Sequence, residues 1–217
     1  MLIVNFPHNP TGVTISRDIY QNIIKLVSEV GAYLLWDAAF EELVYDDLPL
    51  PNPYTQYDKT IYINTLTKCY GLAGLRIGWC ISSPMVINKC KILKDYTTLY
   101  VSPINELIGV YVINNLKKFL NKRLDDVKRN LITLEQWLSE NEKKVYAVLP
   151  QGGVSTFVKL NSIANTKNFC EILAINKKVL LVPGECFDFK QYIRLGIGTS
   201  PENLKYGLKI ISEHLCI

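Results

Sequence analysis

The sequence has few of the residues from which metal sites and disulfide frameworks are built. Its 217 residues include only His8 and His214 as histidines, and these do not stand at metal-ligand spacing. A zinc site, or any other metal site, is therefore not expected. The six cysteines include no C-x-x-C pair, which is typical of reduced thiols that behave as small apolar side chains.

Long apolar runs and clusters of basic residues are also missing. No run approaches the length of a membrane span, and Met1 is followed directly by LIVNF, without the basic region of a signal peptide. The net charge is +4, with no basic face apparent, so nucleic acid is a poor candidate partner. We expect a cytoplasmic protein that acts on a small molecule and binds neither membrane nor nucleic acid.

The apolar content is high enough for a folded protein. Hydrophobic residues make up 48% and charged residues 20% of the chain, which is typical of globular proteins and not of disordered ones. A chain of this length can bury one sizeable core or two small ones.

The most informative stretch is residues 64–79, which read NTLTKCYGLAGLRIGW. An apolar strand is predicted before it, so that Lys68 follows the strand on a tight turn shaped by glycines, with Arg76 eight residues later. Hydroxyls, a cation and glycines suit a phosphate. A lysine amine near another cation loses its proton readily and suits a carbonyl compound. A lone lysine in this position is more often an ordinary solvated side chain.

The first forty residues predict a strand, a helix and a second strand. Residues 2–6 form the first strand, Ser16 caps a helix that runs to Val30, and residues 33–36 form the second strand. This spacing predicts a parallel βαβ unit, whose ligands gather at the carboxyl ends of its strands. The predicted buried face of the helix consists of Ile19, Ile23, Leu26, Val27 and Val30.

Two polar residues stand at the ends of these strands. Asp37 follows the second strand directly, and Asn9 lies in the loop PHNPTG after the first. Two prolines and a glycine predict a loop of one fixed shape. Taken alone, the asparagine is equally typical of a plain turn, and the aspartate of a helix cap.

Helix starts are marked by Ser-Pro pairs. Serine stands at the N-cap and proline at the first helical position in the pairs at residues 83–84, 102–103 and 200–201. Residues 104–142 also have a helical pattern, with a charged interruption at residues 121–129. This long segment is predicted to link two domains.

The last third predicts a compact α+β unit. Strands are expected at residues 145–149, 154–160, 179–182 and 192–195, and helices at 166–176 and 204–215. Arg194 stands on a strand between apolar neighbours. A half-buried arginine needs an anion, which could be a structural ion-pair partner or a substrate.

The stretch TLTKCYGLAGLRIGW resembles the cofactor-lysine signature of class I/II (fold type I) aminotransferases, which use pyridoxal 5'-phosphate (PLP). The resemblance implies that Lys68 binds PLP covalently and acts catalytically, and that Thr65 and Arg76 hold its phosphate. Asn9 would donate to the ring hydroxyl, as the family's NPTG asparagine does. Asp37 would keep the ring nitrogen protonated.

The resemblance extends to the substrate. Arg194 would grip the substrate α-carboxylate through two parallel hydrogen bonds, and the loop PQGG at residues 150–153 resembles one that the family has near the substrate. Several stretches resemble a subgroup that eliminates the hydroxyl of a hydroxyarginine and cyclises it to a cyclic guanidino amino acid. Phe40 stands where many aminotransferases have a tyrosine, so the cofactor would lose one hydrogen bond.

The implied fold class is α/β. Residues 1–115 would be the later part of a fold type I large domain with a mostly parallel sheet, and residues 116–217 a C-terminal α+β small domain. The family has a sizeable region before the NPTG loop that has no counterpart here. The resemblance therefore implies a homodimer, or a chain that needs a partner supplying that region. Ordinary amino-acid transamination and a non-catalytic remnant or assembly module are the alternatives.

Overall fold

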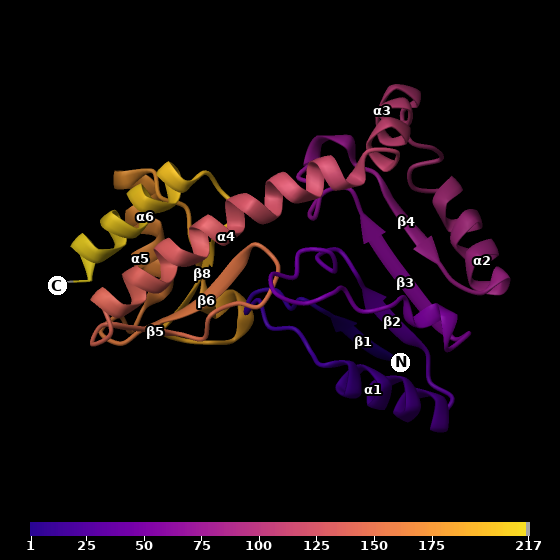
Figure 1. The fold of residues 1–217 in the computed structure, drawn as a ribbon, viewed down its shortest axis with the longest axis horizontal. Coiled ribbons are helices and arrows are strands. Elements are labelled where there is room, and N and C mark those ends of the chain that lie inside the picture. The colour runs from indigo at the N-terminus through magenta and orange to yellow at the C-terminus, as the bar shows by residue number, and fades with distance from the viewer. Residues whose placement is uncertain (216–217) are drawn as a thin grey trace. The chain divides into compact units, whose positions relative to one another are not determined.

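The computed structural model describes residues 1–215, and the chain divides into two compact units. Unit 1 consists of residues 1–8 and 14–123, and unit 2 of residues 9–13 and those from 124 onward. Figure 1 follows the elements along the chain. The boundary between the units falls inside helix α4 (Leu116–Glu140). The predicted division into residues 1–115 and 116–217 concerns family domains and stays a prediction.

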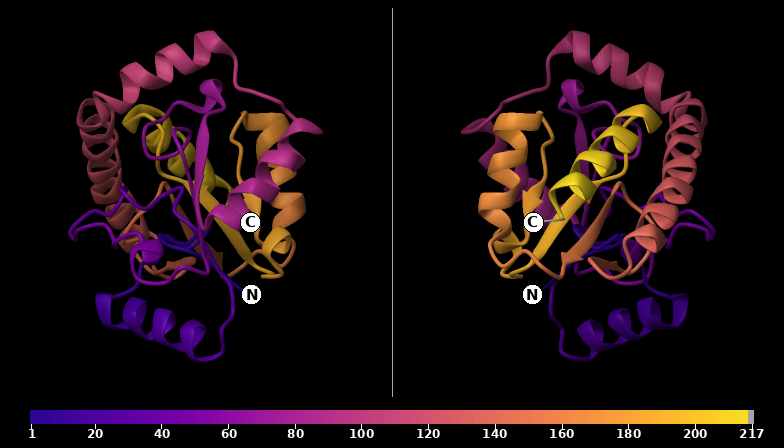
Figure 2. Two further views of the ribbon diagram at one scale, coloured as in Figure 1. Left: turned by 90° about the vertical axis from the view of Figure 1, so that its right-hand side faces the viewer. Right: turned by 90° about the vertical axis from the view of Figure 1, so that its left-hand side faces the viewer.

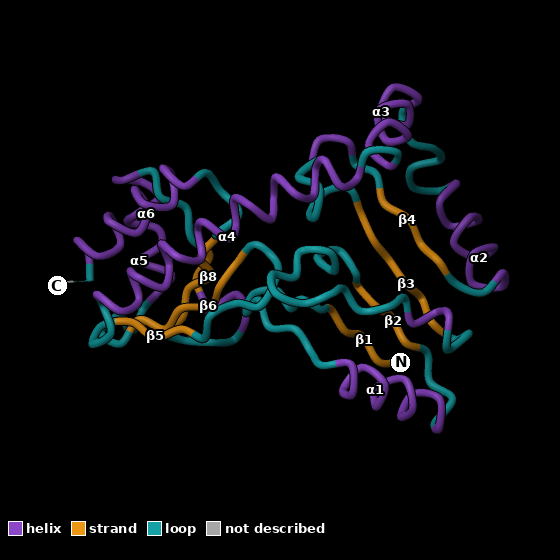
Figure 3. Tube along the Cα trace, in the orientation of Figure 1, coloured by secondary structure: helices purple, strands orange, loops and turns teal. Residues whose placement is uncertain are grey.

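Unit 1 contains a mostly parallel sheet in the order β1-β2-β3-β4 (Figure 3). Its strands are β1 (Leu2–Asn5), β2 (Leu34–Asp37), β3 (Thr60–Thr65) and β4 (Gly78–Ile81). β1, β2 and β3 are parallel, and β4 is antiparallel to β3. The helices are α1 (Arg17–Glu29), α2 (Pro84–Asp95) and α3 (Pro103–Ile113), with 3-10 turns η1 (Pro53–Thr55) and η2 (Ala73–Leu75). The predicted βαβ unit is confirmed.

The buried face of α1 was predicted only in part, because Val27 is buried as expected whereas Ile19, Leu26 and Val30 are exposed. Ser16 caps the helix as expected, accepting a hydrogen bond from the backbone N–H of Ile19 at 3.3 Å. The helix buries Tyr20, Ile24 and Val27, while Ile19 stays 49% exposed. The ring of Tyr20 meets the ring of Trp36 on β2 edge to face, with centroids 5.4 Å apart. The helix therefore turns the stripe that contains Tyr20 toward the core instead of the predicted stripe. Ile23 packs against the same core but is not fully buried.

Three helices begin at the predicted prolines, but the serines before them differ. Ser200 accepts a hydrogen bond from the backbone N–H of Asn203 at 3.3 Å, whereas Ser83 and Ser102 make no side-chain cap bond. The predicted interruption at residues 121–129 is wrong, because α4 runs through it. The break lies instead at residues 114–115. The charged side chains fit a continuous helix because most of them are exposed on its surface.

Unit 2 contains an antiparallel sheet in the order β5-β6-β8-β7. Its strands are β5 (Val145–Ala147), β6 (Ser155–Leu160), β7 (Val182–Pro183) and β8 (Tyr192–Gly196). The other elements are α5 (Thr166–Lys177), α6 (Pro201–His214) and the 3-10 turn η3 (Gly184–Phe187). The strand predicted at residues 179–182 is reduced to β7. Figure 2 shows α6, in yellow, lying along this sheet.

None of the described helices is long and apolar enough to cross a membrane. The described cysteines, at positions 69, 80, 90, 170 and 186, are free thiols, and Cys216 lies outside the described residues.

Asn130 joins α4 to the end of β8 inside unit 2. Its side chain is fully buried, and its amide nitrogen donates to the carbonyls of Ile197 and Thr199, both at 2.8 Å. Because both carbonyls belong to residues that follow β8, this one side chain holds the segment after β8 against α4.

We expect Asn130→Ala to lower the free energy of unfolding by about 2–4 kcal/mol, because it leaves buried carbonyls without a donor. Asn161→Ala is the matched control, since Asn161 is exposed and its amide donates to the carbonyl of Lys143 at 3.2 Å. The control should cost less than about 0.5 kcal/mol. Urea unfolding of both variants measures the difference, and equal losses would contradict the role given to Asn130.

Candidate active site

Lys68 lies on the turn that joins β3 to β4 in unit 1. The backbone N–H of Leu66 donates to the carbonyl of Ile77 at 3.0 Å, and the N–H of Leu72 donates back to Leu66 at 3.2 Å. These bonds close the turn without using the lysine side chain. That side chain is exposed, and its Nζ lies 5.9 Å from the centre of the Phe40 ring.

Two of the three glycines in this stretch are required by the backbone. Gly71 has a φ of +72°, which side chains rarely adopt. A Cβ on Gly78 would lie 2.9 Å from the carbonyl oxygen of Asn64. Gly74 has open space around it and an ordinary φ. The glycine-shaped turn predicted from the sequence therefore depends on Gly71 and Gly78, and not on Gly74.

The predicted phosphate-binding residues lie at the two ends of the same turn. The hydroxyl of Thr65 donates to the carbonyl of Ile77 at 2.8 Å and accepts from the backbone N–H of Thr67 at 3.1 Å. Thr65 thus shapes the turn in this structure. Arg76 is exposed with a left-handed backbone, φ 52°, and its Nη1 donates to the carbonyl of Ala73 at 3.3 Å.

Asp37 is the last residue of β2 and is only partly buried. Its Oδ1 accepts from the backbone N–H of Ala39 at 3.0 Å. It pairs in register with Ile63 of the parallel strand β3, and the N–H of Ala38 donates to the carbonyl of Ile63 at 2.8 Å. The carboxyl ends of β2 and β3 therefore lie side by side, and each leads into a turn that carries a charged side chain.

The turns after β2 and β3 are in direct contact. Besides the approach of Lys68 to the Phe40 ring, the thiol of Cys69 donates to the carbonyl of Ala39 at 3.3 Å. Unit 1 thus brings Asp37 and Lys68 to one edge of the sheet. Within the described residues, no carboxylate forms an ion pair with Lys68 or Arg76, and no cation forms one with Asp37.

Unit 2 brings Asn9 and Arg194 together. Arg194 lies on β8, and its Nη1 donates to Oδ1 of Asn9 at 3.1 Å, while its Cζ lies 5.7 Å from the centre of the Phe187 ring. The side chain is half-buried. The structural ion pair that the sequence left open for Arg194 does not occur among the residues described.

The loop that carries Asn9 packs against the predicted PQGG loop. The backbone N–H groups of Gln151 and Gly152 donate to the carbonyl of Gly12 at 2.8 and 3.0 Å. A Cβ on Gly12 would lie 2.3 Å from the Cβ of Pro150, and its φ is +71°. Gly12 therefore permits both the turn and the close approach.

The sequence analysis missed a group of acidic and phenolic side chains beside the Lys68 turn. Glu41 bonds Tyr62 and Asn64, and Glu42 accepts from the hydroxyl of Tyr70 at 2.7 Å. Burial raises the pKa of Glu41 to about 7, opposed by the hydrogen bonds from Tyr62 and Asn64 and reinforced by the charge of Glu42. The signal that the sequence offered was the pair of adjacent glutamates that follows Phe40.

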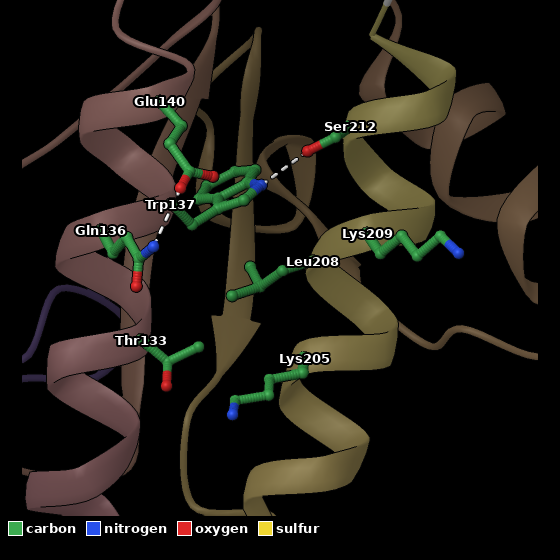
Figure 4. A pocket seen from close by; sticks show the side chains of 8 residues that line it. All are labelled: Thr133, Gln136, Trp137, Glu140, Lys205, Leu208, Lys209 and Ser212. Atoms are coloured by element: carbon green, nitrogen blue, oxygen red, sulfur yellow. Dashed lines mark hydrogen bonds between the residues drawn. The ribbon is translucent and has the colours of Figure 1, made fainter.

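A groove in unit 2 between α4 and α6 contains none of the predicted site residues. Figure 4 shows the Trp137 ring between the helices, with its N–H donating to Ser212 at 2.7 Å, and Gln136 bonded to Glu140. Lys205, Lys209 and Glu140 line the groove. The indole N–H of Trp137 is not available to a ligand, because it already donates to Ser212 on the facing helix. It therefore has no evident ligand chemistry.

Comparison with known proteins identifies the family. The sequence profile of the family described as aminotransferase class I and II matches residues 1–211. Capreomycidine synthase from Streptomyces vinaceus is 33% identical over 99% of this chain and 55% of that enzyme. Aspartate aminotransferase from Thermotoga maritima is 28% identical over 99% of this chain and 55% of that enzyme.

A solved structure matches the fold closely. The crystal structure of the PLP-dependent cyclase OrfR has a TM-score of 0.93 and 33% identity, covering 98% of this chain and 58% of that one. The chain thus spans about half the length of the curated relatives it matches. The predicted fold class and the predicted resemblance, including that to the cyclising subgroup, are confirmed. Because the profile match extends over residues 1–211, this chain belongs to the aminotransferase class I and II family.

Proposed function

We propose that this chain carries part of the active site of a PLP-dependent enzyme of amino-acid metabolism. The observation that carries the proposal is an unbalanced set of charges on well-fixed turns. Lys68 and Arg76 have no carboxylate beside them in an ion pair, and Asp37 has no cation, among the residues described. These charges complement a molecule that has an aldehyde, a phosphate and a ring nitrogen.

The side chains of unit 1 fit PLP in their chemistry. The exposed amine of Lys68 is accessible to an aldehyde. Arg76 spends one donor on the carbonyl of Ala73 and keeps the rest of its guanidinium for an anion. Oδ1 of Asp37 accepts a backbone N–H, and Oδ2 is available for a protonated ring nitrogen. Thr65 would add a hydroxyl near the phosphate.

The pair in unit 2 fits the remaining functions. Because Oδ1 of Asn9 accepts from Arg194, the amide nitrogen of Asn9 is turned away from that bond and can donate elsewhere. We assign this N–H to the ring hydroxyl of the cofactor. The half-buried Arg194 is assigned to the substrate α-carboxylate, since its guanidinium can donate two parallel hydrogen bonds to such a group.

PLP, when bound, supplies an electron sink that stabilises negative charge at the substrate Cα. Lys68 would hold the cofactor covalently, and its amine, once displaced by the substrate amine, would take the proton from Cα. Asp37 would keep a proton on the ring nitrogen, and Asn9 would stabilise negative charge at the ring oxygen. Arg194 would orient the substrate by its carboxylate.

For the specific reaction we propose elimination and cyclisation of a hydroxyarginine. The hydroxyl leaves as water after Cα deprotonation, and the guanidine then adds to the new double bond. This assignment rests on the 33% identity to capreomycidine synthase and on Phe40, which replaces a phenol donor by an apolar ring next to Lys68. The similarity to an aspartate aminotransferase supports ordinary transamination as the second candidate.

Exposed apolar faces of unit 1 support an assembled enzyme. Helix α2 buries none of its residues, and Ile104 and Leu107 of α3 are 72% and 74% exposed. Large apolar side chains exposed on neighbouring turns of a helix are typical of an interaction site. We propose that these faces pack against further polypeptide of the enzyme, in a homodimer or with a chain that supplies the region preceding the NPTG loop in the family.

The cofactor assignment is tested by treating the chain with PLP and borohydride and then mapping the labelled peptide. We expect a visible absorption band and a stable adduct on Lys68, which Lys68→Ala abolishes. Lys59→Ala is the matched control, because Lys59 is an exposed lysine of the same unit that donates to the carbonyl of Gly31 at 3.1 Å. Label spread over surface lysines without preference for Lys68 would refute the assignment.

Arg194→Lys tests the carboxylate assignment. One ammonium cannot reproduce a two-bond fork, so we expect the Michaelis constant to rise about tenfold or more, with a smaller change in kcat. The measurement is steady-state kinetics of the assembled enzyme. An unchanged Michaelis constant would contradict the role of Arg194.

The product distinguishes the two reactions. With a hydroxyarginine, we expect mass spectrometry to detect a cyclic product lighter by one water, and no keto acid. A keto acid formed together with the aminated cofactor would instead identify a transaminase. Absence of turnover by an assembled enzyme that binds PLP at Lys68, without borohydride treatment, would favour a non-catalytic protein.

A further inference from the structure

A closed triangle of hydrogen bonds lies beside the Lys68 turn. The hydroxyl of Tyr62 donates to Oε1 of Glu41, and the amide nitrogen of Asn64 donates to the same oxygen at 2.8 Å and to the Tyr62 hydroxyl at 3.0 Å. Tyr62 and Asn64 are buried residues of β3, whereas Glu41 belongs to the segment after Asp37. The triangle therefore ties that segment to β3.

The triangle reaches the start of the Lys68 turn through Asn64. The amide nitrogen of Asn64 points into the triangle and shares its donor between the two oxygens, so the carbonyl oxygen of the side chain faces the other way. That oxygen accepts from the backbone N–H of Thr65 at 2.6 Å. The orientation of the Asn64 amide, and with it the start of the turn, is thus set by Glu41.

The neighbouring glutamate makes a second tie to the other side of Lys68. Oε2 of Glu42 accepts from the hydroxyl of Tyr70 at 2.7 Å. Tyr70 is buried and stands two residues after Lys68. The two glutamates therefore bond the chain before and after the lysine.

We propose that Glu41 and Glu42 are positioning residues that fix the Lys68 turn relative to Asp37. The proposal deepens the function proposed above, because it concerns the same cofactor-binding edge of unit 1. Neither glutamate is assigned a contact with cofactor or substrate. Glu41 acts through Tyr62 and Asn64 of β3, and Glu42 acts through Tyr70 of the turn. The short segment after Asp37 is thereby bonded to the chain on both sides of Lys68.

The energetics favour positioning over simple filling of the core. Burial of the Glu41 carboxyl is unfavourable for its charged form and raises its pKa to about 7. An apolar side chain would occupy the same volume without that penalty. What the carboxyl adds is direction, because one oxygen receives two donors from fixed points on β3.

Hydrogen exchange of the cofactor-free chain tests the two ties separately. In Glu41→Ala the Thr65 amide should exchange about tenfold faster, as expected when about one hydrogen bond is lost. In Glu42→Ala the accelerated amides should be those of Gly71 and Leu72. Glu41→Gln keeps an oxygen at the same place and should restore the exchange rate of Thr65.

Ser82→Ala is the matched control for general loosening of β3. Its hydroxyl donates to the carbonyl of Thr60 at 2.7 Å, at the opposite end of the strand. This variant should leave the amides of Thr65, Gly71 and Leu72 unchanged. Equal acceleration in all the variants, or none in Glu41→Ala, would overturn the proposal whether or not the chain binds PLP.

Labelling of Lys68 by PLP links positioning to the site. Glu41→Ala should raise the PLP concentration for half-maximal adduct about tenfold, the effect of about one lost hydrogen bond. Glu41→Gln should return it to the wild-type value. A wild-type chain that forms no adduct on Lys68 would refute the proposed function alone. A wild-type chain that is labelled, together with Glu41→Ala labelled at the same PLP concentration, would refute positioning.

A pH profile separates the Glu41 carboxyl from its neighbours. The groups that face it are Tyr62 and Asn64 on β3, Glu42 on its own segment, and Tyr70 and Cys69 on the turn after Lys68. The folded carboxyl keeps its proton up to about pH 7, whereas its ordinary pKa is 4.5. The urea midpoint should therefore fall as the pH rises from about 4.5 to about 7, and Glu41→Gln should flatten the profile. An identical profile in that variant would contradict the burial of Glu41.

Discussion

The candidate site depends above all on the parallel pairing of β2 with β3. That pairing brings the ends of the two strands to one edge of the sheet, and a backbone bond from Ala38 to Ile63 continues it past the last residue of β2. The chain must turn away from the sheet at both ends, because neither strand continues. Asp37 and Lys68 are displayed on those turns, so their proximity follows from strand register and not from any contact between their side chains.

The polar atoms around these turns divide into two sets with different uses. The hydroxyl of Thr65 and the amide of Asn64 make their hydrogen bonds within the protein and so give the turns their shape. The charged ends of Lys68 and Arg76 remain exposed. The cationic groups thus remain largely available for a ligand, while hydroxyl, amide and carboxyl groups beside them carry the structural bonds.

Sequence reasoning succeeded where the signal is local or belongs to a long motif. The βαβ unit follows from the change between continuous apolar strands and an apolar spacing typical of a helix. The lysine turn follows from the long motif at residues 65–79. The face of α1 was predicted only in part because two apolar stripes overlap on it, and only the Tyr20–Trp36 contact across the core selects one. The Glu41 contacts were missed because they join segments about twenty residues apart, which spacing alone does not reveal.

The loop at residues 9–13 gives unit 2 a discontinuous sequence. In the sequence, segments of unit 1 precede and follow this loop. Its Asn9 nevertheless bonds Arg194, which is 185 positions away. During synthesis this loop emerges well before Gln151 and Gly152 and 185 residues before Arg194, so it completes its native contacts only after most of unit 2 has left the ribosome. A fragment that begins at residue 124 would contain every strand of the second sheet but would lack Asn9, the residue that Arg194 contacts. Domain dissection of this protein therefore needs a permuted or grafted loop.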